Sequence, residues 1–109
     1  HRYAEELFVI QQGSALLRTP QGIETVHSGD IIFFESGETG AHQLYNHTDQ
    51  PCIFLDIRTY IGHDICEYPD SNKIIIVPNG ETFKRDEQHS YFEGEENIRD
   101  IWNKLNCAE

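Results

Sequence analysis

Three residues of metal-binding types, His1, Glu6 and His42, stand on or beside short apolar segments of this 109-residue chain. Successive side chains of a β-strand point to opposite faces, so Glu6 would share one face with Phe8 and Ile10. A carboxylate that points into an apolar interior is costly unless it is paired or bound to a metal ion. The alternation therefore predicts that Glu6 is buried for a chemical reason.

His42 stands in the same relation to Leu44 on a different segment. A buried carboxylate and buried imidazoles from separate strands make a metal site, and this set of donors suits Fe(II), Mn(II), Zn or Ni. We therefore predict that Glu6 and His42 contribute to a site for a divalent metal ion. Two alternatives stay open: that Glu5 is the inward carboxylate, and that His42 is a hydrogen-bonded histidine of the core.

The elements that would position these residues are short strands separated by turns. Runs rich in Ile, Val, Phe and Leu alternate with segments that contain Gly, Pro, Asn or Asp, at a spacing of roughly 8–12 residues. Such spacing is typical of an all-β sandwich or barrel and not of a parallel α/β sheet. The strands are expected over residues 7–10, 14–18, 23–26, 31–34, 41–45, 52–58 and 74–77.

Beyond residue 58 the strand pattern weakens. Residues 60–73 are expected to be irregular, and residues 81–94 are polar with scattered aromatic side chains. A helix is predicted over about residues 95–106, because apolar residues there recur at positions i, i+3, i+4 and i+7. We expect this helix to pack on the same domain, and a partner-binding helix is the alternative. Its apolar residues are Ile98, Ile101, Trp102 and Leu105.

The segment that opens the chain resembles the first motif of the cupin superfamily. That motif is a glycine, five residues, His-x-His, three or four residues, a glutamate, six residues and a glycine. Here four residues separate His1 from Glu6, and six separate Glu6 from Gly13. The first histidine of the pair would precede His1.

A later segment resembles the second cupin motif, in which a proline, a glycine, a histidine and an asparagine follow a glycine. The matching positions are Gly29, Gly37, His42 and Asn46. Glu35 stands where the motif has proline, and two extra residues separate Gly37 from His42. Two motifs in this order, with strands between them, make the chain similar to small single-barrel cupins of largely uncharacterised function.

The resemblance implies an all-β fold, the double-stranded β-helix or jelly-roll barrel of the cupins. The barrel would occupy residues 1–77, and residues 78–109 would form an irregular extension that carries the helix. Residues 64–70 and 83–94 also resemble segments that follow the barrel in this group of proteins. By the same resemblance, the metal ligands are His1, Glu6 and His42.

The chain contains no methionine and begins with a histidine. An initiator methionine is not normally removed ahead of so large a residue, so we expect the natural protein to extend upstream. A fourth ligand and one or two strands of the barrel would lie there. A strand edge left unpaired without them favours pairing with another chain, and the resemblance also implies a homodimer.

Cupins include dioxygenases, isomerases, epimerases and decarboxylases that use a metal ion in the barrel. One hypothesis is therefore a metal-dependent enzyme that acts on a small molecule at the mouth of the barrel. The alternative is a non-catalytic barrel that binds or senses a small ligand without a functional metal site. A fold does not fix a function, and no residue pattern here identifies a catalytic residue.

Composition restricts the partners. The chain has 8 basic and 19 acidic residues, a formal net charge of −11, which repels nucleic-acid phosphates and anionic membranes. No apolar run reaches membrane-spanning length, and three scattered cysteines do not form a framework of paired disulfides. We therefore expect a cytoplasmic protein whose partner is a small molecule, with no nucleic acid and no membrane.

Overall fold

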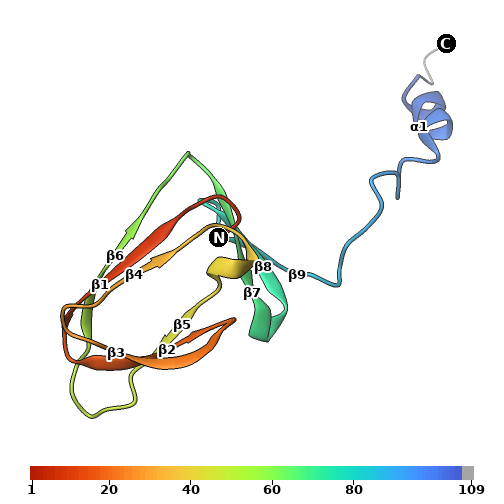
Figure 1. Ribbon diagram of the computed structural model, residues 1–109. Helices are drawn as coiled ribbons and strands as arrows, with labels where there is room; N and C mark the ends of the chain where they lie inside the picture. The colour runs from red at the N-terminus through yellow and green to blue at the C-terminus, as the bar shows by residue number, and fades with distance from the viewer. Residues whose placement is uncertain (107–109) are drawn as a thin grey trace.

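The computed structural model describes residues 1–106, and its nine strands form three three-stranded antiparallel sheets (Figure 1). Sheet A has the order β4-β1-β6, and its strands are β1 (Glu6–Gln12), β4 (Ile31–Phe34) and β6 (Ile53–Arg58). Sheet B has the order β3-β2-β5, and its strands are β2 (Ser14–Thr19), β3 (Gly22–His27) and β5 (Gln43–Tyr45). The all-β prediction is thereby confirmed, with the strands arranged in three small sheets.

The core lies between sheets A and B. Inward-facing residues of β1, β2, β3 and β4 make one cluster, in which Ile10 and Leu17 are 1% and 0% exposed. Alternation explains the choice of residues, because every second side chain of β1 and β2 points into this space. The cluster consists of Phe8, Ile10, Ala15, Leu17, Val26 and Phe34.

Sheet C differs from the sequence prediction, since two of its strands lie where irregular structure was expected. It has the order β7-β8-β9, with β7 (Asp64–Tyr68), β8 (Lys73–Val77) and β9 (Glu81–Lys84). The polar residues of β7 and β9 hide the strand pattern, and both strands form because each pairs with the isoleucine-rich β8. The expected domain boundary after residue 77 therefore falls inside this sheet.

Two short 3₁₀ helices connect the sheets, and one α-helix follows them. The 3₁₀ helices are η1 (Glu38–Gly40) and η2 (Pro69–Ser71), and the α-helix is α1 (Ile98–Leu105). Within residues 1–106, no helix has the length and apolar character needed to cross a membrane.

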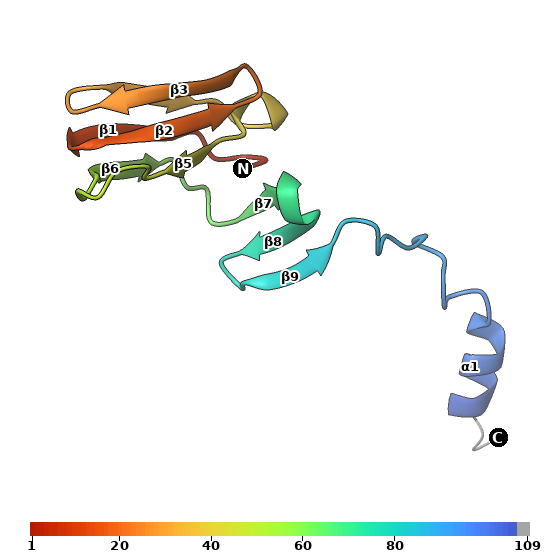
Figure 2. The same cartoon turned by 90° about the horizontal axis from the view of Figure 1, so that it is seen from below.

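Helix α1 exists as predicted, but it is shorter and does not pack on the sheets as we expected. Figure 2 shows it separated from sheet C by the chain that follows β9. Its apolar residues Ile98, Ile101, Trp102 and Leu105 are all at least 43% exposed. Residues 85–97, which lead to the helix, are exposed as well, so this segment does not hold the helix against a sheet.

The outer face of sheet A is apolar and open. Strand register places Leu7 between Phe33 and Ile57, and the next outward row has Val9 between Ile31 and Leu55. The four residues of β4 and β6 in these two rows are 46–66% exposed. Patches of this kind on a soluble domain commonly mark an interaction surface.

Close backbone packing explains why position 13, the glycine of the first motif, is occupied by glycine. Its φ is +82°, and a Cβ atom there would lie 2.3 Å from the carbonyl oxygen of Pro51. The turn between β1 and β2 thus requires both the left-handed region and a close approach of two backbones.

We expect Gly13→Ala to destabilise the fold more than Gly80→Ala. Gly80 has the same φ of +82° but nothing within 4 Å of its added Cβ, so its substitution costs only the left-handed conformation, roughly 1–2 kcal/mol. At Gly13 the backbone must also move. Urea unfolding followed by circular dichroism measures both losses, and equal losses would contradict the packing explanation.

Candidate metal centre

Glu6 is the buried carboxylate of the site. It lies at the start of β1, is 5% exposed, and faces the interior with Phe8 and Ile10. Glu5 is exposed, so the alternative in which Glu5 points inward is wrong. The strand alternation seen in the sequence is therefore sufficient to place this carboxylate.

His42 meets Glu6 inside the sheets. Its Nε2 lies 2.8 Å from Oε1 of Glu6, and its ring stacks on Phe34 at a centroid distance of 3.7 Å. Its Nδ1 lies 2.7 Å from the carbonyl oxygen of Gly40. Since a carbonyl only accepts hydrogen bonds, Nδ1 carries the proton of the neutral ring, and the lone pair of Nε2 faces Glu6.

The backbone of η1 fixes this carbonyl in place. A Cβ atom at Gly40 would lie 1.7 Å from the carbonyl oxygen of Glu35, so η1 packs directly on the preceding chain. The Gly40 carbonyl is therefore held where it can orient the imidazole of His42.

The pKa values of Glu6 and His42 are both shifted toward the uncharged forms of the side chains. The pKa of Glu6 is raised to about 7, mainly by burial and in addition by a hydrogen bond to Asp56 of β6 and by the charge of Asp56. Burial also lowers the pKa of His42, although the bond to Gly40 partly opposes this. A carboxylate and an imidazole that both resist their charged forms suit a bound cation, which takes the place of the proton.

His1 approaches the same carboxylate from the other side. Its Nε2 lies 3.6 Å from Oε1 of Glu6, and its side chain is 16% exposed. Its carbonyl accepts a hydrogen bond from the N–H of Gly37, and the next N–H, of Arg2, donates to Ile65 on β7. The residue is thus held between the loop before η1 and sheet C.

The structure therefore brings together all three residues that the sequence singled out as ligands. Both imidazoles direct Nε2 toward the carboxylate of Glu6, and His42 comes from a later segment than His1 and Glu6. Two imidazole nitrogens and a carboxylate are a fitting donor set for Fe(II), Mn(II), Zn or Ni.

Sequence reasoning assigned no role to two residues of this region, Asp64 and Cys66. They alternate along β7 and are 3% and 8% exposed. Asp64 Oδ2 lies 2.6 Å from Nδ1 of His1, and Cys66 Sγ lies 3.2 Å from the same atom. The signal that was available is their i, i+2 spacing, but without the knowledge that 64–68 is a strand it carried no weight.

His1, Asp64 and Cys66 form a second group of possible ligands, whose atoms lie within 4.8 Å of one another. Burial raises the pKa of the Cys66 thiol, and the charge of Asp64 adds to this, so the thiol is protonated when no metal ion is bound to it.

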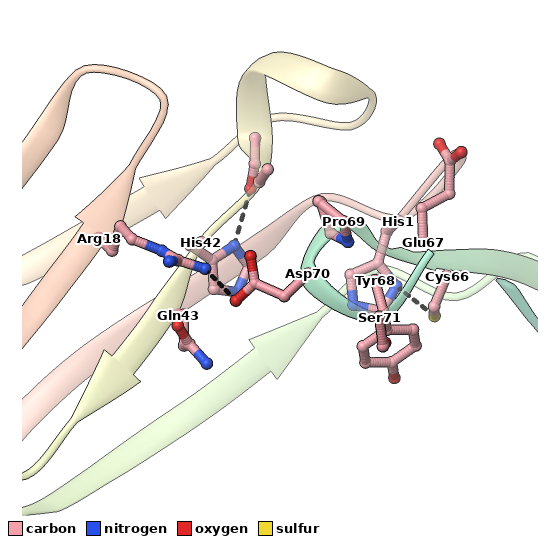
Figure 3. Close-up of a pocket in the computed structure, with 12 residues that line it drawn as sticks. His1, Arg18, His42, Gln43, Cys66, Glu67, Tyr68, Pro69, Asp70 and Ser71 are labelled. Carbon is pink, nitrogen blue, oxygen red and sulfur yellow. Dashed lines mark hydrogen bonds and ion pairs between the residues drawn. The ribbon is translucent and has the colours of Figure 1, made fainter. Parts of the chain in front are cut away.

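A cavity of about 390 Å³ opens beside the ligands (Figure 3). His1, His42 and Cys66 line it, and an ion pair between Arg18 of β2 and Asp70 of η2 spans it. Its volume lies within the range of small-molecule sites, roughly 300–1,000 Å³.

The four histidines outside this site are exposed. None of them has an atom paired with Glu6, and two of them pair only with a neighbouring carboxylate on their own segment within residues 1–106. These residues are His27, His47, His63 and His89.

Two solved structures are similar to most of the chain. One is a sugar phosphate isomerase of the cupin superfamily from Silicibacter pomeroyi, with a TM-score of 0.72 and 23% identity over 84% of this chain. The other is a proposed sugar phosphate isomerase from Acidithiobacillus ferrooxidans, with a TM-score of 0.71 and 22% identity over 82% of this chain. The resemblance to cupins is thereby confirmed at the level of the fold.

The likeness has a defined extent. The chain spans 60% and 58% of the lengths of those two proteins. No protein-family model matches the chain, and no curated protein sequence matches it.

We expect metal-free protein to lose stability as the pH rises through about 7, because of Glu6. Its pKa is about 7 in the folded state and 4.5 without the fold, so the folded state retains a proton that the unfolded state has released. The stabilisation is complete below about pH 4.5 and is lost above about 7. Urea unfolding in a chelator from pH 5 to 8 measures it.

Glu6→Gln should remove this pH dependence, whereas Glu5→Gln, a change at the exposed neighbour, should leave it in place. If the two variants show the same pH profile, the loss of stability does not come from the buried carboxylate.

Proposed function

We propose that this cupin-fold chain binds one divalent metal ion through Nε2 of His1, the carboxylate of Glu6 and Nε2 of His42, and acts on a small molecule beside it. One observation carries the proposal. Each imidazole has its Nδ1 hydrogen-bonded to an acceptor and its Nε2 directed at the same buried carboxylate. Metal-binding histidines in proteins are held in this manner.

The ion would supply Lewis acidity, which polarises a carbonyl or phosphoryl oxygen of a bound molecule. The chain's own residues do the rest. Phe8 and Phe34 pack against the His42 ring and exclude water from one side of the site. The cavity lets a small molecule reach the two histidines from the other side.

A phosphorylated sugar is the substrate class that we propose to test first. The two similar structures are sugar phosphate isomerases by name, and their fold is shared with this chain. The cavity is lined in part by polar side chains, Arg18 and Gln43 among them, which form hydrogen bonds with hydroxyl and phosphate oxygens. A non-catalytic barrel that binds the same class of molecule is the second candidate.

Protein purified without added metal should contain about one divalent ion per chain, measured by elemental mass spectrometry. His42→Ala should lose it, because the substitution removes one of three ligands. His47→Ala, a change at an exposed histidine of the next turn, should retain it. If neither wild type nor the His47 variant holds stoichiometric metal, the metal proposal is wrong.

An assay on the metal-loaded protein distinguishes an enzyme from a non-catalytic binding barrel. Aldose and ketose phosphates are incubated with it, and the reaction is followed by proton exchange from solvent deuterium at the sugar carbons. Exchange that His42→Ala abolishes supports an isomerase. Saturable binding of the same sugars with no exchange supports the non-catalytic barrel.

The homodimer remains a prediction, and we propose that the apolar outer face of sheet A mediates it. A two-fold contact places the same patch on both copies, and an apolar patch is complementary to itself. Light scattering should give twice the mass of one chain for wild type and for Tyr45→Glu, which changes an exposed residue of sheet B. Phe33→Glu, in the patch, should give the mass of one chain. A monomeric wild type would refute the homodimer.

A further inference from the structure

Asp64 is a buried carboxylate for which the metal proposal has given no role. It begins β7, outside sheets A and B, and is 3% exposed. A charged group that deep is costly unless its oxygens are fully hydrogen-bonded. Its partners therefore indicate what keeps it there.

The two oxygens of Asp64 have different partners. Oδ1 accepts hydrogen bonds from the backbone N–H groups of Tyr3 at 3.0 Å and Ile65 at 2.8 Å. Oδ2 lies 2.6 Å from Nδ1 of His1. The backbone thus fixes the plane of the carboxylate, and the oxygen that remains is directed at the imidazole.

This arrangement decides which nitrogen of His1 carries the proton. A carboxylate accepts hydrogen bonds, so in the neutral ring the proton lies on Nδ1, and the lone pair of Nε2 is on the side of Glu6. The same logic holds for His42, whose Nδ1 donates to the Gly40 carbonyl. Two independent elements, β7 and η1, thus set the two imidazoles in the same protonation form.

We propose that Asp64 is a positioning residue, which holds His1 with its proton on Nδ1 and its Nε2 free to bind metal beside Glu6. The inference rests on the metal site proposed above and adds sheet C to it. Sheet C then supplies the group that orients a ligand of the site, although none of its strands pairs with sheets A or B.

The contacts of Asp64 differ from those of the structural ion pairs nearby. The other carboxylates of this part of sheet C and η2, Glu67 and Asp70, pair with arginines that are 39–49% exposed. Such exposed pairs contribute little to stability. Asp64 is buried, has no arginine or lysine partner among the described residues, and is bonded to a proposed ligand.

Cys66 makes the second contact to Nδ1 of His1 and is not a substitute for the carboxylate. Its Sγ lies 3.2 Å away, on the same side of β7 as Asp64. A protonated thiol is a weak acceptor, so it does not fix the tautomer. Cys66→Ser is therefore a matched control at the same imidazole.

Asp64→Asn tests the proposal, because it replaces the acceptor that faces Nδ1 of His1 with a donor and changes little else. The amide oxygen can still accept from Tyr3 and Ile65, which leaves NH₂ facing Nδ1 of His1. An NH₂ group donates, so Nδ1 becomes the acceptor and the proton moves to Nε2. Nitrogen-15 chemical shifts of the His1 ring in metal-free protein should show Nδ1–H in wild type and Cys66→Ser, and Nε2–H in Asp64→Asn.

Metal binding is the second readout, with Zn²⁺ and Co²⁺ as the probes. Loss of an orienting partner typically weakens metal binding about 10–100-fold, and we expect a loss of this size for Asp64→Asn. Glu93→Gln, in the exposed pair with His89, should bind as tightly as wild type. Equal affinities of Asp64→Asn and wild type would overturn the proposal.

The chemical shifts test the positioning role of Asp64, and the metal affinities test the metal site, so one can be wrong without the other. Nε2–H in metal-free wild type would overturn the positioning role by itself, even if the Asn variant did not fold. If wild type shows Nδ1–H and the Asn variant shows Nε2–H, but neither protein binds Zn²⁺ or Co²⁺, then Asp64 sets the tautomer as proposed and the metal function is wrong.

Discussion

The site depends on one constraint: a carboxylate, that of Glu6, is buried beside the apolar core of a small sheet protein. Burial in such a place raises the pKa of the acid and leaves it in need of a partner. His42 supplies one partner at 2.8 Å, and its ring is itself clamped against Phe34. The aromatic contacts that stabilise the core therefore also set the geometry of the chemical groups.

A second consequence concerns the part of the chain that follows the two main sheets. Sheet C supplies no residue of the main core cluster, yet β7 begins with a carboxylate fixed by two backbone N–H groups and aimed at His1. Precise placement is what a histidine ligand requires, because a rotated ring or the wrong tautomer removes its lone pair from the site. Sheet C and η1 thus act on the two histidines in equivalent ways.

Much of this could be predicted from the sequence. Alternation on β1 placed Glu6 inward, and short apolar runs between turn residues placed the strands of sheets A and B.

Other features could not be predicted, for two physical reasons. Strand β7 carries Asp64 and Glu67, so its stability comes from pairing with β8 and not from its own pattern. The stripe of α1 predicted burial, but periodicity does not say what the helix packs against, and the stripe is exposed at Trp102 and Leu105.

The sequence by itself determined the fold class and the residue types of the site, since both follow from local order: side-chain alternation, turn residues and motif spacing. Only the tertiary structure decided which nitrogen of each imidazole faces Glu6, because that depends on acceptors brought from elsewhere. Gly40 lies two residues from His42, whereas Asp64 lies 63 residues from His1. A contact across that separation is set by how the sheets pack, and no local pattern records it.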